Sequence, residues 1–199
     1  MGFSGHLVFA RSERPLLEAP LFSSTGPELR DDVHGWQPRP GGWQTLQLEQ
    51  GIWEDDCLFA LVEWTGAPAC VADVSDSSVA LVTGLHTNGR RWQAWLNLDN
   101  AAALLLEEPE DVDDLSLWMA TPEFEKAIGH ERAELDAEVP ADAEGALMWA
   151  SAAGVQAAAA QQPRIEELLR AQETFVEELF DALLDELGFP EAVHSTPQP

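Results

Sequence analysis

The sequence predicts an α+β fold, in which a mostly antiparallel sheet of five or six strands (residues 1–98) packs against a helical half (residues 99–188). The first half contains short β-branched runs bounded by Gly, Pro, Asp and Ser, whereas apolar residues in the second half recur at helical spacing. Charge changes at the same boundary: residues 1–100 contain 13 acidic and 6 basic residues, and residues 101–199 contain 23 and 4. We expect residues 1–188 to form a single domain and residues 189–199 a flexible tail.

Six short segments have the composition of strands and are expected to form the sheet: residues 5–11, 43–49, 57–65, 69–74, 78–85 and 91–98. In residues 43–49, large and polar side chains alternate, which is typical of a strand with one buried face. The dipeptide Asn88-Gly89 predicts a hairpin between the last two strands, because both residues accept the positive φ that a tight turn requires. Five prolines in residues 12–42 predict an irregular connection.

Helices are expected over residues 99–106, 121–137, 140–154 and 163–187. Asp99 is expected to cap the first of them. Thr121 followed by Pro122 marks a helix start, because Thr caps free N–H groups and Pro fits the first helical position. The last helix is the longest, has one broad apolar face and ends at Gly188, which favours the left-handed conformation that ends helices. An acidic loop, residues 107–114, separates the first two helices.

The composition excludes two classes of partner. With 36 acidic and 10 basic residues, the chain has a formal charge of −26, so it lacks the cationic surface that direct binding to nucleic acid or to anionic membranes requires. The uncharged residues 145–163 are numerous enough to span a bilayer, but their Ala and Gln content predicts a soluble helix. The N-terminus lacks the pattern of a signal peptide, which predicts a cytoplasmic protein, and nine Arg to one Lys with no Tyr indicate a bacterial source.

No motif predicts a catalytic, cofactor-binding or metal-binding residue. The five histidines do not occur at metal-ligand spacing, and the chain has no glycine-rich phosphate loop and no nucleophile elbow. Cys57 and Cys70 are predicted to be reduced thiols among apolar residues, with a disulfide between them as the alternative. The acidic runs at residues 54–56 and 110–114 lack the glycine of a calcium loop and are expected to be solvated.

The most unusual pattern is a row of acids spaced four residues apart on the last predicted helix. Like charges at this spacing destabilise a helix by roughly 0.2–0.5 kcal/mol per pair, and no lysine is interspersed. We interpret the row, together with the acidic loop, as a surface that attracts a basic protein. The candidate partner-binding residues are Glu173, Glu177, Asp181 and Asp185 on the helix, and Glu110, Asp111, Asp113 and Asp114 in the loop.

Three functions are compatible with the sequence. The first is a non-enzymatic interaction protein of the inhibitor, immunity or adaptor type, which docks a basic partner. The second is a DNA mimic whose carboxylate rows imitate phosphates, since acids one helical turn apart lie about 5–6 Å from each other. The third is a small-molecule enzyme or binder that uses a pocket lined by some of the eight tryptophans. Trp92 and Trp95 must lie on opposite faces of one strand, so one of them faces away from the main core.

Overall fold

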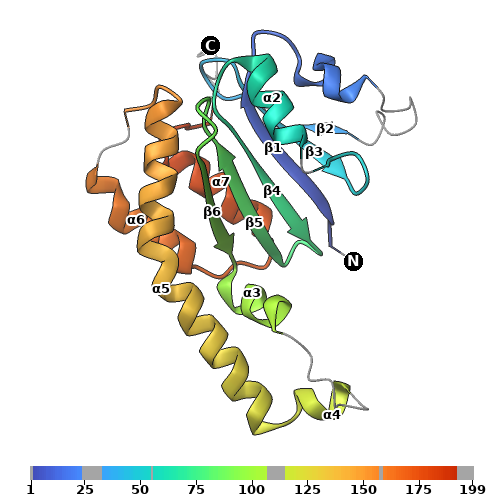
Figure 1. The fold of residues 1–199 in the computed structure, drawn as a ribbon, viewed down its shortest axis with the longest axis vertical. Helices are drawn as coiled ribbons and strands as arrows, with labels where there is room; N and C mark the ends of the chain where they lie inside the picture. The colour runs from blue at the N-terminus through green and yellow to red at the C-terminus, as the bar shows by residue number, and fades with distance from the viewer. Residues whose placement is uncertain (1, 24–32, 55, 107–114, 157–158, 192–199) are drawn as a thin grey trace, which may run out of the picture.

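The computed structural model describes residues 2–23, 33–54, 56–106, 115–156 and 159–191, and its centre is a six-stranded sheet (Figure 1). The strands are β1 (Gly5–Arg11), β2 (His34–Gly35), β3 (Trp43–Glu49), β4 (Ala69–Ser75), β5 (Val79–Leu85) and β6 (Arg91–Leu96). Their order across the sheet is β2-β3-β1-β4-β5-β6, and every neighbouring pair is antiparallel. The α+β fold with an antiparallel sheet is therefore confirmed.

Most of the helices that follow the sheet cover one of its faces, here called the inner face. The helices after the sheet are α3 (Leu98–Leu105), α4 (Leu115–Met119), α5 (Pro122–Ala152), α6 (Gln162–Arg170) and α7 (Val176–Glu186). Helices α3, α5, α6 and α7 contribute buried residues to the core on the inner face. Trp149 of α5 is fully buried, and its Nε1 donates a hydrogen bond to the carbonyl of Ala69 at 3.1 Å. Phe9 stacks on Trp43 with ring centroids 4.8 Å apart, and Phe189 packs edge-on against both. The N-terminal part of α5 extends beyond the sheet together with α4 (Figure 1).

The opposite, outer face of the sheet is covered only in part. Helix α2 (Cys57–Thr65) and two 3-10 turns, η1 (Leu16–Glu18) and η2 (Pro20–Phe22), pack mainly on β1, β3 and β4. On the same face, Gln93 of β6 is exposed and Trp95 is half-buried, whereas Trp92 is buried beneath the inner helices. Burial alternates along β6 as expected for a strand, but Trp95 also packs against the inner core that contains Trp92.

Residues 57–65 form a helix, and the prediction of a strand there was wrong. Leu58, Leu61 and Val62 recur at helical spacing and bury one side of α2. Gly66 ends the helix with a φ of 66°, and its N–H donates to the carbonyl of Val62 at 2.9 Å. A short apolar run does not distinguish a strand from a buried helix, because either one can place its side chains in the core.

The boundaries of the longer helices also differ from the prediction. The two helices predicted over residues 121–137 and 140–154 are replaced by the single 31-residue helix α5, with Pro140 inside it. A proline removes one backbone hydrogen bond, and buried side chains on both sides of it, such as Val139 and Ala143, hold the helix together. The predicted helix 163–187 is instead interrupted between α6 and α7. The side chain of Asn97 bonds to the N–H and the carbonyl of Glu173, at 3.0 and 2.9 Å, and so competes with the backbone bonds of a continuous helix.

Three smaller expectations are settled by single residues. Helix α3 begins at Leu98 with Asn97 as its N-cap residue, so Asp99 lies inside the first turn and is not the cap. Phe189, predicted to begin a loose tail, is 3% exposed and belongs to the inner core. Cys57 and Cys70 are both free thiols, so the disulfide alternative was wrong.

None of the helices in the described ranges combines the length and the hydropathy that crossing a bilayer requires.

Candidate functional site

A groove of about 490 Å³ lies between helix α7 and the residues that follow β2. We call it the acidic groove and define it by six of the residues that line it: Trp36, Glu177, Glu178, Asp181, Asp185 and Glu191. Five of these side chains are carboxylates, and Trp36 supplies an aromatic wall. Three of the predicted partner-binding residues, Glu177, Asp181 and Asp185, therefore share one concave surface with an indole ring.

Helix α7 is anchored at its N-terminal end by the turn between β4 and β5. The N–H of Val176 donates to the carbonyl of Ser77 at 2.8 Å, and the hydroxyl of Ser77 donates to Oε1 of Glu177 at 2.6 Å. The apolar side of the helix is buried in the inner core through Val176, Leu179, Phe180, Leu183 and Leu184. Four acids of α7, Glu177, Glu178, Asp181 and Asp185, are thereby placed on the side of the helix that lines the groove.

A buried arginine, Arg39, binds two of these acids. Its side chain is 2% exposed, and its guanidinium forms ion pairs with Asp181 and Asp185, whose side chains are 31% and 47% exposed. The same guanidinium donates to the carbonyl of Asp181 at 3.3 Å and to the carbonyl of Phe189. A buried guanidinium is tolerated when its donors are satisfied in this way. Asp181 and Asp185 therefore contribute to the fold as well as to the groove.

The other three acids of the groove form no ion pair within the described part of the chain. Glu178 and Glu191 are exposed, and Glu177 is half-buried. Although Oε1 of Glu177 accepts the bond from Ser77, Oε2 is buried and has no hydrogen-bond partner among the described residues. Leaving a buried acceptor without a donor costs roughly 1–3 kcal/mol. Because Oε2 is shielded from solvent, the exposed carboxylates of Glu178 and Glu191 are the groups that a partner can reach.

Trp36 is fixed by contacts on both its backbone and its ring. Its N–H donates to the carbonyl of Thr45 at 3.0 Å, and its Nε1 donates to Oε1 of Gln47 at 3.1 Å. The ring packs edge-on against Phe180, with centroids 6.4 Å apart. A fixed indole next to carboxylates is a combination that recognises a guanidinium or an ammonium group, through cation–π attraction and charge-assisted hydrogen bonds.

The acidic groove contains only part of the predicted partner surface. Glu173 precedes α7, is exposed and does not line the groove. The acids predicted in the loop, Glu110, Asp111, Asp113 and Asp114, lie outside the described residues. Trp36 and Arg39, which belong to the proline-rich segment 12–42, were not predicted as residues of the partner surface. Arg39 lies 142 residues before Asp181, and no periodic pattern connects two residues so far apart.

A smaller hollow between β6 and α5 bears on the alternative of a tryptophan-lined ligand pocket. It measures about 310 Å³, and its lining includes His86, Trp92 and Asp142. Burial, together with the negative charge of Glu138, raises the pKa of Asp142 to about 6. Burial and the nearby charge of Arg90 lower the pKa of His86. This hollow combines a perturbed carboxylate with one tryptophan, whereas a stacking pocket of the expected kind needs at least two.

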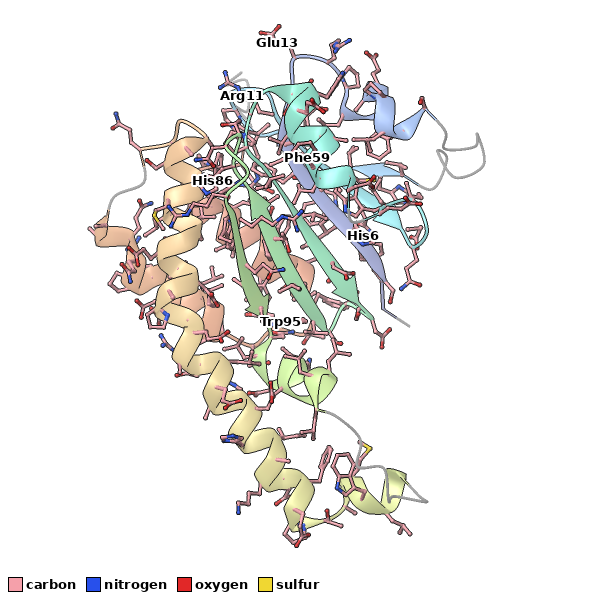
Figure 2. The ribbon with its side chains drawn as sticks, viewed as in Figure 1. His6, Arg11, Glu13, Phe59, His86 and Trp95 are labelled. Carbon is pink, nitrogen blue, oxygen red and sulfur yellow. The ribbon has the colours of Figure 1, made fainter. Side chains whose placement is uncertain are left out.

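Another hollow, of about 290 Å³, lies on the outer face of the sheet. Trp53, His6 and Asp73 are among its lining residues, and Nε2 of His6 is 3.7 Å from Oδ1 of Asp73. Figure 2 shows His6 on β1, below helix α2. This hollow also contains a single tryptophan. Neither hollow therefore matches the predicted tryptophan-lined pocket, whereas the acidic groove contains three residues of the predicted docking surface.

Comparison with known proteins assigns no function to the chain. No protein family model matches it, and no curated protein and no solved structure matches it. Within the described ranges, no group of three or more His, Cys, Asp or Glu side chains is arranged to hold a metal ion. The acidic groove brings three of the predicted partner-binding acids together with an indole ring, and it is the site on which a function is proposed below.

Proposed function

We propose that this protein is a non-enzymatic docking module that binds a basic segment of a partner protein in its acidic groove. The observation that carries the proposal is the placement of Trp36 beside Glu177, Asp181 and Asp185 in one concavity. A convex acidic surface only attracts cations, whereas a shallow groove with an aromatic wall can also stack on a cationic side chain. Arginine fits this groove best, because its planar guanidinium stacks on indole and forms paired hydrogen bonds with carboxylates.

The charge of the groove supports the same partner. Five carboxylates line it and one guanidinium, that of Arg39, pairs with two of them, which leaves a formal charge of −4. The whole chain carries −26, and such a field steers a positively charged partner and speeds association at low salt. The exposed carboxylates of Glu178 and Glu191 are the acceptors that a donor from the partner reaches most readily.

The contacts of Arg39 favour a protein segment over DNA mimicry. A phosphate mimic needs a row of accessible, unpaired carboxylates that a cationic cleft can contact. Asp181 and Asp185 instead share the guanidinium of Arg39, and Glu173 lies before the start of α7. A single basic side chain that enters the groove requires fewer accessible acids than a mimic of a phosphate row.

The proposal is tested with a fluorophore-labelled peptide that contains two arginines separated by glycine, whose binding is followed by fluorescence anisotropy. The double variant E178Q/E191Q removes two exposed charges from the groove. Its matched control, E123Q/E125Q, removes two exposed charges from the first turn of α5. We expect the groove variant to weaken binding by about tenfold and the control by less than about twofold.

Equal weakening by the two double variants would show that the peptide follows the net charge of the chain, and the groove would then not be the site. The role of the aromatic wall is checked separately with W36F and W36L. Because phenylalanine keeps a π face and leucine does not, we expect W36L to weaken binding more than W36F. Similar affinities for W36F and W36L would contradict the stacking part of the proposal.

A further inference from the structure

A larger hollow, of about 720 Å³, lies where strand β1 ends. We call it the arginine pocket and define it by six of its lining residues: Arg11, Glu13, Arg14, Gly41, Gly42 and Trp64. Its walls come from the end of β1, from the turn before β3 and from the end of helix α2. Figure 2 shows Arg11 and Glu13 at this end of the sheet, remote from the N-terminus. The sequence analysis did not single out any of these residues as a site.

The two arginines of this pocket differ from most others in the chain. Arg39, Arg132, Arg164 and Arg170 each lie within 4.0 Å of a carboxylate oxygen. In the ranges that the structure describes, neither Arg11 nor Arg14 forms such an ion pair. Arg90 and Arg91 also form no ion pair within the described residues, so Arg11 and Arg14 are distinguished by the pocket that both of them line.

The backbone that carries Arg14 is fixed by hydrogen bonds. The N–H of Arg14 donates to the hydroxyl of Ser12 at 3.1 Å. The amide of Gln44 donates to the carbonyls of Ser12 and Arg14 at 3.0 and 2.9 Å. The guanidinium of Arg14 lies over the ring of Trp64, 4.7 Å from its centroid. Stacking fixes the plane of a guanidinium and leaves its in-plane N–H groups available for an anion.

Two consecutive glycines shape the wall of the pocket next to these arginines. Gly41 and Gly42 have φ angles of 85° and 83°, which side chains rarely adopt. A Cβ atom at Gly42 would lie 3.2 Å from the carbonyl oxygen of Ser12 and 3.9 Å from Cγ of Arg11. The absence of side chains at this turn therefore keeps the space beside Arg11 open.

We infer that the arginine pocket binds a small molecule that carries a phosphate monoester, with the phosphate held by Arg11 and Arg14. Two guanidinium groups match a phosphate monoester, which carries about −1.5 to −2 charges at neutral pH. The volume of about 720 Å³ exceeds what inorganic phosphate fills and corresponds to a site for an organic ligand. The chain's charge of −26 disfavours a long polyanion such as nucleic acid.

Two features of the pocket oppose an anion and narrow the class of ligand. The carboxyl end of α2 contributes carbonyl dipoles, so the attraction must come from the arginines. Glu13 also lines the pocket and repels a bare anion. The same carboxylate can accept a hydrogen bond from a hydroxyl group, which favours a phosphorylated polyol or sugar over phosphate alone.

Isothermal titration calorimetry in a phosphate-free buffer tests this inference with inorganic phosphate, glycerol 3-phosphate and glucose 6-phosphate as probes. The variant R11Q/R14Q removes both guanidinium groups, and R90Q/R91Q is its control, because it removes two exposed arginines from the start of β6. We expect at least one organic phosphate to bind more tightly than inorganic phosphate. We also expect R11Q/R14Q to weaken that binding by at least about tenfold and R90Q/R91Q by less than about twofold.

Two results would overturn the inference. Absence of binding by every probe up to about 10 mM excludes a phosphate site of useful affinity. Equal binding of all three probes, weakened equally by both double variants, indicates an adventitious ion only. Far-ultraviolet circular dichroism verifies that each variant is folded. If R11Q/R14Q does not fold, the more conservative variant R11K/R14K gives an independent measurement. Because lysine lacks the planar fork of arginine, R11K/R14K is expected to bind more weakly than the wild type.

Discussion

The acidic groove and the arginine pocket use charged side chains in different ways. In the groove, Asp181 and Asp185 pair with the buried Arg39, and Glu177 accepts a hydrogen bond from Ser77. In the arginine pocket, the two guanidinium groups have no carboxylate partner among the described residues, and Arg14 contacts the ring of Trp64 instead. Asp181, Asp185 and Glu177 therefore contribute to folding as well as to the proposed docking surface, whereas the arginines of the pocket remain available for the proposed ligand.

This difference shows why net charge alone does not locate function in this chain. The formal charge of −26 predicts that cationic partners are attracted. It does not reveal that one arginine neutralises part of the acidic groove, or that two others lie together in a pocket. Measurements of stability separate these roles, because loss of an internally bonded charge destabilises the fold and loss of an unpaired surface charge does not.

The largest effect is expected for R39M. Removal of one partner from a fully buried ion pair costs 3–5 kcal/mol, and the partial exposure of Asp181 and Asp185 reduces this to about 3 kcal/mol or slightly less. The carbonyl of Phe189 also loses its donor. Urea denaturation at pH 7 measures the change in the free energy of unfolding.

The matched control for R39M is R11M, which removes an exposed arginine from the other site. We expect R11M to change the free energy of unfolding by less than about 0.5 kcal/mol. If R39M and R11M destabilised the protein equally, the acidic groove and the arginine pocket would not differ in how much their arginines contribute to folding.

A second effect, of about 2 kcal/mol, is expected for N97A. Asn97 is fully buried, and its side chain bonds to the carbonyl of Ser78 and to both backbone groups of Glu173. Alanine leaves both backbone groups of Glu173 without these partners, whereas the carbonyl of Ser78 keeps the bond from Asn100. Alanine also lacks the polar side chain that lets asparagine adopt a φ of 60°. Thermal and urea unfolding measure the loss, and N97G separates its causes, because glycine relieves the backbone strain without restoring the hydrogen bonds. A loss smaller than about 0.5 kcal/mol for N97A would show that Asn97 does not hold the start of α7.

Patterns within short segments predicted the larger part of the fold. Alternation in residues 43–49 and the Asn88-Gly89 turn correctly indicate β3 and the β5–β6 hairpin. These features depend on neighbouring residues, so the sequence displays them directly. The run at residues 57–65 was misread, because its apolar side chains satisfy a strand and a helix equally well, and tertiary packing decides between them.

The candidate site was predicted only where it depends on a single helix. The four-residue spacing placed Glu177, Asp181 and Asp185 on one side of α7, and the structure places all three in the groove. The contacts of Arg39 join segments separated by more than 140 residues, and such contacts leave no local pattern. Glu173 does not line the groove because of another contact between distant residues. The side chain of Asn97, at the end of the sheet, bonds to the backbone of Glu173 and interrupts the predicted helix there.

A third prediction concerns Asp142, an acid outside both sites whose ionisation opposes folding. Its pKa is raised from 3.8 to about 6, chiefly by burial. The folded state therefore binds the proton of Asp142 more tightly than the unfolded state does. The stabilisation that this proton gives is complete below pH 3.8 and is lost as the pH rises through about 6. After allowance for the partial exposure of the side chain, we expect D142N to stabilise the protein by about 1 kcal/mol at pH 7.5.

For a chain of this size, such a gain raises Tm by about 3 °C. The variant and the wild type should have nearly the same stability at pH 3.5, because Asp142 is then protonated in both states. E123Q removes an exposed charge from the same helix and controls for the general reduction of negative charge. If D142N stabilised the protein by the same amount at both pH values, the raised pKa would not be the cause.

The smallest effect is expected at the contact between Arg14 and Trp64. An exposed cation–π pair contributes about 0.5–1 kcal/mol, so R14A should reduce the free energy of unfolding by no more than this in urea denaturation. R14K keeps the charge but loses the planar stacking, and its effect should lie between those of the wild type and R14A. A loss above about 2 kcal/mol for R14A would mean that Arg14, like Arg39, is held for the stability of the fold. The contrast between the two sites would then fail, because the arginines of the pocket would serve the stability of the fold and not the binding of a ligand.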